Sequence, residues 1–155
     1  MIKKTIQYHD YDGNLREDDF YFNLTQVELA KINGDPSLPG GLQASAERAA
    51  RNNDSGEMVR IIDMMISRSY AMKLPDGAFV KRNASGLPLY EMFVNTEAYD
   101  NLMTELVQSE DGIVNFLTGC LSKETQDKVK AEWAKRKEAG ELTQVIANQI
   151  SVSQE

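Results

Sequence analysis

The chain is poor in the residues that build covalent and metal-bound sites. Its 155 residues include one cysteine, Cys120, one histidine, His9, and one tryptophan, Trp133. A single cysteine excludes an intrachain disulfide and favours a reducing compartment. The ligand spacings of zinc sites, such as CxxC and HxxxH, are absent from the sequence. We therefore expect this protein to use neither a metal nor another cofactor.

Positive charge and long apolar runs are also scarce. There are 17 Lys and Arg against 24 Asp and Glu, so the net charge is −7. Binding to nucleic acid or to anionic lipid depends on clustered Lys and Arg, which an acidic chain disfavours. No window approaches the roughly 18 consecutive apolar residues of a membrane span, and the first residues lack the apolar core of a signal peptide. We expect a cytoplasmic protein that binds neither nucleic acid nor membrane.

Catalysis has little support in the sequence. Cys120 would need a base, and His9 is the only imidazole available. Cys120 lies on an apolar helical stripe, which predicts core packing, and His9 lies at the end of a predicted hairpin, where an exposed polar residue is ordinary. The acidic turn Asp10–Asn14 lacks the glycine and the glutamate that an EF-hand loop needs at its positions 6 and 12. Phosphate-binding loops are absent too, so we expect no enzyme activity.

The first 32 residues predict a β-hairpin that leads into a capped helix. Ile2, Ile6 and Tyr8 alternate with polar residues, and Phe20 and Phe22 do the same on the return arm. A turn cluster over 10–14 separates the arms, and its Gly13 can take positive φ. Thr25 and Glu28 then form the pattern of a capping box.

Helical periodicity dominates the rest of the chain to residue 121. Helices are expected over 42–52, from Asp54 as N-cap to about 69, from Pro88 to 93, from Thr96 as N-cap to 107, and from Asp111 as N-cap to 121. Between the second and third of these helices, residues 78–81 are expected to form a short extended piece that can add an edge to the hairpin sheet. The fold class is therefore α+β: an N-terminal hairpin with an optional third short strand, packed by a mostly helical domain that carries a C-terminal helical extension.

Composition changes at residue 122 and predicts two parts, a domain over 1–121 and an extension over 122–155. Residues 123–137 are expected to form a charged helix in which Val129 and Trp133 are the only large apolar residues. A short amphipathic helix is expected to follow, and its apolar residues at i, i+3, i+4 and i+8 are called the C-terminal stripe: Leu142, Val145, Ile146 and Ile150. We predict that Trp133 and the C-terminal stripe bind a partner, another copy of the chain, or the chain's own domain.

Methionine is the one adaptable residue that the chain uses freely, with seven copies. A plastic surface for helical clients is one interpretation, because promiscuous binders use methionine in that way. The other, which we prefer, is that most of them fill irregular gaps in the core. Apart from Met1, the methionines are Met58, Met64, Met65, Met72, Met92 and Met103.

An ordered set of short patterns resembles the small tail assembly chaperones of siphophages and prophages of Gram-positive hosts. The set covers residues 1–121 and contains EDDFYFNLTQVEL at 17–29, Gly40-Gly41-Leu42, Ser69-Tyr70, Asp76-Gly77 with Phe79 and Lys81, Phe93 with Thr96-Glu97-Ala98-Tyr99, and Val114-Asn115-Phe116-Leu117 with Gly119. The resemblance implies a non-enzymatic chaperone that binds the tape measure protein, keeps it soluble and helps recruit the tail-tube protein. It also implies action in the host cytoplasm, as a monomer or homo-oligomer, and absence from the mature virion. The alternative is a structural virion component, such as a tail connector or tube-associated subunit.

Overall fold

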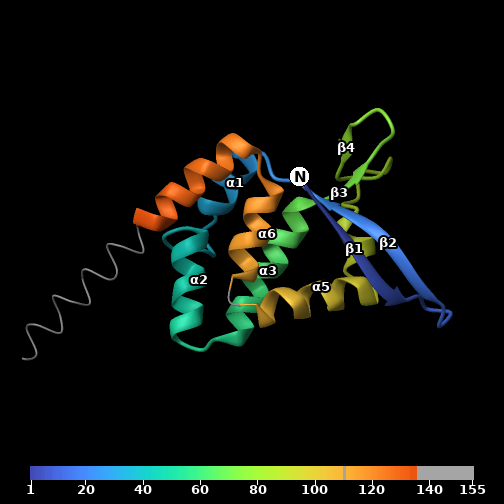
Figure 1. The fold of residues 1–155 in the computed structure, drawn as a ribbon, viewed down its shortest axis with the longest axis horizontal. Helices are drawn as coiled ribbons and strands as arrows, with labels where there is room; N and C mark the ends of the chain where they lie inside the picture. Colours follow the sequence, from blue (N-terminus) through green and yellow to red (C-terminus); the bar gives the residue numbers. More distant parts are fainter. Residues whose placement is uncertain (110, 136–155) are drawn as a thin grey trace, which may run out of the picture. The chain divides into compact units, whose positions relative to one another are not determined.

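The computed structural model describes residues 1–109 and 111–135, and the chain divides into two compact units, Met1–Ser122 and Lys123–Glu155. Within its described residues the first unit joins a four-stranded antiparallel sheet to six helices, which confirms the predicted α+β class. Figure 1 shows that α5 reaches from the other helices toward the hairpin. In the second unit, residues 123–135 are helical, and Lys128 Nζ lies 3.1 Å from Glu124 Oε1 one turn earlier.

The predicted hairpin is confirmed. Strands β1 (Ile2–His9) and β2 (Leu15–Phe22) pair antiparallel, with Ile2 opposite Phe22 and His9 opposite Leu15. The turn uses Gly13 at φ 81°, a left-handed conformation that costs a glycine little. Because the register is uninterrupted over eight pairs, alternate residues of both strands face the helices.

The sheet is wider than the sequence predicted. Strand β3 (Tyr70–Lys73) pairs with β2, and strand β4 (Phe79–Val80) pairs with β3, so the order is β1-β2-β3-β4. The extended piece expected at 78–81 is therefore present, but it reaches the hairpin only through β3, which was not predicted. Four residues carry too little periodicity to reveal a strand, and the partner of Tyr70 in the sheet, Phe22, lies far away in the sequence.

The first three helices begin at the residues that the sequence indicates. Helix α1 (Gln26–Asn33) has the full capping box, since Thr25 Oγ1 accepts from Glu28 N at 3.2 Å and the Glu28 carboxylate accepts from Thr25 N at 2.9 Å. Helix α2 spans Leu42–Arg51. Helix α3 (Ser55–Ser69) is capped by Asp54, whose side chain accepts from Glu57 N at 3.0 Å.

The next three helices differ from expectation in detail. Helix α4 (Tyr90–Phe93) starts after Pro88, which instead forms an isolated bridge with Arg82. Helix α5 (Glu97–Gln108) is capped by Thr96 as predicted, but Asp111 makes no side-chain capping bond to α6 (Gly112–Cys120). From helical spacing alone, Ile113, Val114, Leu117, Cys120 and Leu121 are expected to face inward, but Ile113 and Val114 are only partly buried and Phe116 is buried instead. The apolar face of this short helix is therefore rotated from the expected one.

Helix α3 is the centre of the helical layer and contacts α2, α5 and α6. Its stripe of Ile61, Ile62, Met65 and Ile66 is fully buried, as the 3.6-residue period predicted. Strand β1 approaches α6 closely at Gly119, where an added Cβ would lie 2.7 Å from Ile2 Cδ1. The largest fully buried side chains are Phe22, Ile32, Leu38, Leu42, Ile61, Ile62, Met65, Ile66, Phe93, Leu102, Phe116 and Leu117.

Candidate partner-binding surface

Four aromatic rings form a continuous row across the helix-facing side of the sheet. We call Tyr8, Phe20, Phe93 and Tyr70 the aromatic row. Successive ring centroids are 5.9 Å apart from Tyr8 to Phe20, 5.0 Å from Phe20 to Phe93, and 4.5 Å from Phe93 to Tyr70, whose rings are stacked. Three of the rings come from alternate positions of β1, β2 and β3, and α4 supplies the fourth. The row therefore exists only because β3 joins the sheet.

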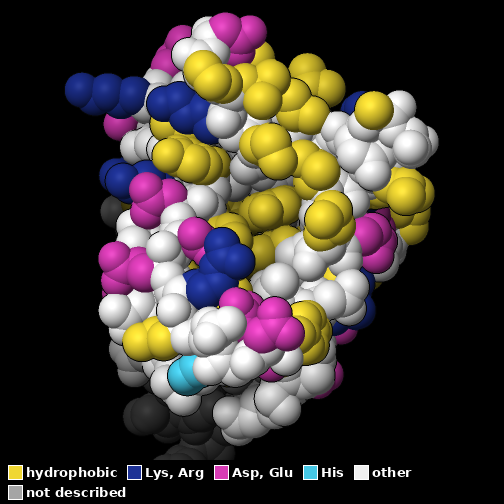
Figure 2. Space-filling view, turned by 90° about the vertical axis from the view of Figure 1, so that its right-hand side faces the viewer, with side chains coloured by type: hydrophobic (Ala, Val, Ile, Leu, Met, Phe, Trp, Pro, Cys, Tyr) yellow, Lys and Arg dark blue, Asp and Glu magenta, His cyan; other side chains and the backbone are white. Residues whose placement is uncertain are grey.

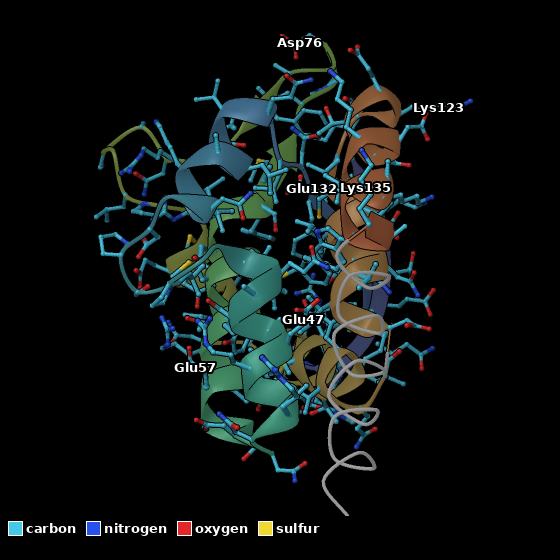
Figure 3. The ribbon with its side chains drawn as sticks, turned by 90° about the vertical axis from the view of Figure 1, so that its left-hand side faces the viewer. Glu47, Glu57, Asp76, Lys123, Glu132 and Lys135 are labelled. Atoms are coloured by element: carbon cyan, nitrogen blue, oxygen red, sulfur yellow. The ribbon has the colours of Figure 1, made fainter. Side chains whose placement is uncertain are left out.

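This row is not sealed from solvent. Phe93 is buried, whereas the other three rings are only partly buried. Met72, two residues after Tyr70 on the same face of β3, is 52% exposed, and Met92, next to Phe93, is 70% exposed. Figure 2 shows hydrophobic side chains gathered around a hollow on this side of the molecule, whereas on the opposite side α2 presents charged groups such as Glu47 (Figure 3). Contiguous exposed apolar groups are typical of interaction sites in proteins.

The methionines are divided between core and surface. Met65 is fully buried, and Met58, Met64 and Met103 are partly buried. Met72 and Met92 are exposed. The preferred prediction, that most methionines fill the core, allows these two exceptions, and both lie beside the aromatic row. A long unbranched side chain at such positions can adapt to more than one apolar partner.

At its Tyr8 end the aromatic row borders a cavity of about 320 Å³ between the hairpin turn and the start of α5. The lining residues are Tyr8, His9, Asp10, Tyr11, Arg16, Thr96 and Glu97. Tyr8 donates its hydroxyl to Asp18 at 2.7 Å, a bond that raises the pKa of Tyr8, and Arg16 lies 3.2 Å from the same carboxylate. Carboxylates therefore outnumber cations at this end.

A three-residue cluster fixes the helix that supplies Phe93. Tyr90 of α4 and Tyr99 of α5 both donate their hydroxyl protons to Asp63 Oδ1 of α3. Burial, followed by these hydrogen bonds, raises the pKa of Tyr99 to about 12 and moves the pKa of Tyr90 upward even further. Three helices thus meet at one carboxylate, which connects α4 and α5 to α3.

Stability should fall steeply as the pH rises from about 9 to 12. The folded protein holds the Tyr90 and Tyr99 protons above their ordinary pKa of 10.0, and burial raises the pKa of the Cys120 thiol to about 12. The unfolded chain releases these protons first, so the stabilisation is complete below pH 9 and is lost as the pH increases. Melting temperature against pH, with tyrosinate absorbance, measures this. Tyr99→Phe should flatten the decline, and an identical profile in that variant would contradict the assignment.

Lys81 connects the start of α1 to the end of α3. Its ammonium donates to both oxygens of Glu28 and to the carbonyls of Asn23 and Arg68, each at 2.8 Å. Burial opposes the charged form of Glu28, but the bonds from Lys81 and from the Thr25 backbone outweigh it and lower the pKa of Glu28. These bonds fix the position of Lys81, directly after β4, and thereby the edge strand that pairs with Met72 of β3.

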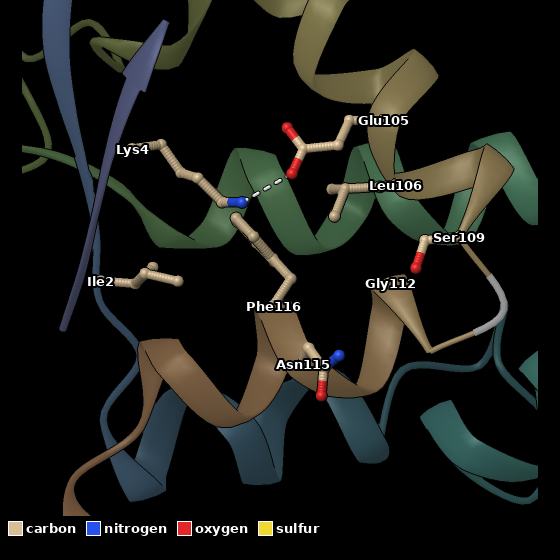
Figure 4. A pocket seen from close by; sticks show the side chains of 8 residues that line it. All are labelled: Ile2, Lys4, Glu105, Leu106, Ser109, Gly112, Asn115 and Phe116. Carbon is tan, nitrogen blue, oxygen red and sulfur yellow. Dashed lines mark hydrogen bonds and ion pairs between the residues drawn. The ribbon is translucent and has the colours of Figure 1, made fainter.

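A second, smaller cavity of about 160 Å³ lies between β1, α5 and α6 (Figure 4). Lys4 Nζ and Glu105 Oε1 meet there at 2.8 Å, so the two charges at its mouth already satisfy each other. Gly112 keeps the α5–α6 connection tight, because a Cβ at this position would lie 2.6 Å from the Leu106 carbonyl oxygen. These contacts give the cavity a structural role in joining strand to helix.

The residues predicted from the sequence as partner-binding are not brought together by the described structure. Trp133 lies in the helix over 123–135 and is partly buried. The four residues of the C-terminal stripe, Leu142, Val145, Ile146 and Ile150, lie outside the described residues. Their role therefore stays a prediction. Sequence reasoning had assigned Tyr8 and Phe20 to the buried side of the hairpin, and it had no signal for the third strand that completes the row.

Residues considered for catalysis or ligand binding have structural places. Cys120 is fully buried in α6, as predicted, and His9 is exposed with Nδ1 3.3 Å from Glu97 Oε1. Over 1–109 and 111–135, no three His, Cys, Asp or Glu side chains are grouped so as to hold a metal ion. None of the helices in that part of the chain has the length and apolar character to cross a membrane.

Comparison with known proteins gives one match. The model of a family described as phage tail assembly chaperone matches residues 1–155. It therefore extends through 122–155, beyond the patterns in 1–121 that carried the resemblance. Among curated proteins and among solved structures, nothing matches the chain.

Proposed function

The chain belongs to the phage tail assembly chaperone family, and on that premise we propose that it binds the tape measure protein without catalysing a reaction. It keeps the long apolar helices of that client soluble and helps recruit tail-tube subunits. It acts in the host cytoplasm and is not retained in the mature virion. Each of these steps needs an apolar contact surface on a soluble carrier, and none needs an active site.

The observation that supports this proposal most is the solvent-accessible aromatic row with Met72 and Met92 at its sides. Aromatic and methionine side chains suit a client whose apolar faces vary along its length, because they offer large contact areas that can repack. The net charge of −7 keeps a complex with an apolar client in solution, since like-charged particles repel each other.

We propose Trp133 and the C-terminal stripe as a second contact, made to the client or to another copy of the chain. Ile146→Asp should reduce the amount of client captured, or the mass of a self-associated form, by about half or more. Its melting temperature should stay within about 2 °C of the wild type, because a surface contact contributes little to folding. Light scattering and co-purification measure the first effect. A fall of many degrees would instead show that the stripe belongs to a folded core.

Co-expression tests the function itself. The tape measure protein of the same phage, produced alone, should be largely insoluble, and it should move to the soluble fraction and co-purify when this chain is present. An equally insoluble client in both cases would contradict the proposal. Mass spectrometry of purified virions separates the structural alternative, because stoichiometric amounts of the chain in particles would identify a virion component.

A further inference from the structure

We propose that the aromatic row is the docking site for one amphipathic helix of the client, whose cationic side chains lie over the hairpin end of the row. This inference rests on the proposed function and adds the surface, the secondary structure and the charge of the bound segment. Such docking requires that the spacing of the rings match the side-chain spacing of a helix. It also requires that the surface bind a helix more readily than a strand, and that one end of the row carry a charge opposite to that of the client.

The spacing of the rings matches the side-chain spacing of a helix. Successive centroids are 5.9, 5.0 and 4.5 Å apart. Residues three or four apart on an α-helix are offset by about 4.5–6 Å along its axis. Apolar side chains at i, i+3 or i+4, and i+7 of a client helix can therefore lie over the exposed parts of Tyr8, Phe20 and Tyr70, whereas Phe93 supports these rings from the core. Met92 and Met72 lie beside the row and can close over such a helix from its two sides.

A client strand has less to bind at this end of the sheet. The outer edge of β1 near the row is already used by α5, since Asn101 Nδ2 donates to the Gln7 carbonyl at 2.9 Å and the Glu97 carboxylate accepts from His9 N at 3.3 Å. Strand addition depends on free backbone groups along an edge. The aromatic row offers side chains on a sheet face, which is the contact that an amphipathic helix makes.

Charge orients the client. At the Tyr8 end, the carboxylates of Asp10, Asp18 and Glu97 face one guanidinium, Arg16, and one imidazole, His9. Residues 1–122 hold 11 Lys and Arg against 18 Asp and Glu, so this unit carries the whole net charge of −7. Lysine or arginine on the flank of an apolar client helix would meet an excess of negative charge there, which favours one orientation.

Overlapping synthetic peptides of the tape measure protein, titrated against the full chain by fluorescence anisotropy, test the site. Met92→Glu should weaken the tightest peptide at least about tenfold, because it places a charge within the apolar contact. The matched control is Val27→Glu, at a position 63% exposed on α1, and it should change the Kd less than twofold. Both variants should melt within about 2 °C of the wild type, since both positions are largely exposed.

A second matched pair tests the charge. Asp18→Asn keeps an acceptor for the Tyr8 hydroxyl but removes one negative charge from the row, and should weaken the same peptide about threefold. Asp19→Asn removes the same charge from the opposite face, where Asp19 accepts from Thr5 Oγ1 at 2.6 Å, and should leave the Kd unchanged. Equal effects of the two substitutions would overturn the proposed orientation.

The outcomes separate this inference from the function on which it rests. A wild-type chain that binds no peptide and leaves the tape measure protein insoluble contradicts both. Peptide binding that is weakened equally by Met92→Glu and Val27→Glu, or that is lost only in Ile146→Asp, overturns docking on the aromatic row while the chaperone function stands. Tight binding of peptides without helical apolar periodicity also overturns it.

Discussion

Phe93→Ala is expected to lower the free energy of unfolding by about 3–5 kcal/mol, the cost of removing a buried aromatic side chain. Phe93 is 2% exposed, and its ring contacts those of Phe20, Phe22, Tyr70 and Tyr99 at centroid distances from 4.5 to 5.9 Å. Among the aromatic rings of residues 1–109 and 111–135, Phe93 is the one that contacts rings of the hairpin, β3 and α5 together. Chemical denaturation should show the loss directly, and the melting temperature should fall by about 10–20 °C.

The neighbouring residue supplies the control for this prediction. Met92→Ala removes an exposed side chain from the same helix and should change the free energy of unfolding by less than about 0.5 kcal/mol. Because Tyr70 stacks on Phe93, the Phe93→Ala variant should also lose client binding at temperatures where it remains folded. A loss below about 1 kcal/mol in Phe93→Ala would show that α4 does not hold the sheet against the helices.

Lys81→Met should cost about 2 kcal/mol, the scale of a lost set of charge-assisted hydrogen bonds in a partly buried site. The substitution retains the apolar stem but removes the ammonium that donates to Glu28 and to the carbonyls of Asn23 and Arg68, so that Glu28 keeps the bond from Thr25 N but loses its cation. The start of α1 then loses its connection to the end of α3. The capping box of α1 is also weakened, because Glu28 is part of it. Urea denaturation at pH 7 measures the effect.

The pH dependence of this variant identifies the interaction. The pKa of Glu28 in the folded wild type is below its ordinary 4.5, so the stabilisation is present above pH 4.5 and is lost as the pH falls through the folded value. The difference between wild type and Lys81→Met should therefore shrink below about pH 4. A double-mutant cycle with Glu28→Gln should show strong coupling. A difference that is constant from pH 7 to pH 3 would assign the loss to packing instead.

Local signals predicted most element boundaries correctly. The alternation of Ile2, Ile6 and Tyr8 fixed both the hairpin and its inward face, because a one-residue slip would expose all of them. Thr25, Asp54 and Thr96 marked the starts of α1, α3 and α5, since a capping side chain satisfies donors within its own first turn. These features depend on residues a few positions apart, which a sequence displays.

The candidate site depended on contacts that no local pattern records. Strand β3 pairs with the edge of β2, where Tyr21 lies opposite Ala71 and Phe22 lies opposite Tyr70. The sequence of Tyr70–Lys73 alone cannot indicate that this edge is available. Alternation placed Tyr8 and Phe20 on the helix-facing side, but only the position of the short helix α4 decides how far they are covered. The same holds for Met72 and Met92, whose exposure follows from where the helical layer ends.

A photo-crosslinking amino acid placed at position 92, in cells that also make the tape measure protein, tests the central claim most directly. We predict covalent adducts with the tape measure protein from position 92, confined to apolar helical segments of the client, and no adducts from position 27 on α1. Adducts from position 27 with none from position 92, or no adducts from either while the client remains soluble, would contradict docking on the aromatic row.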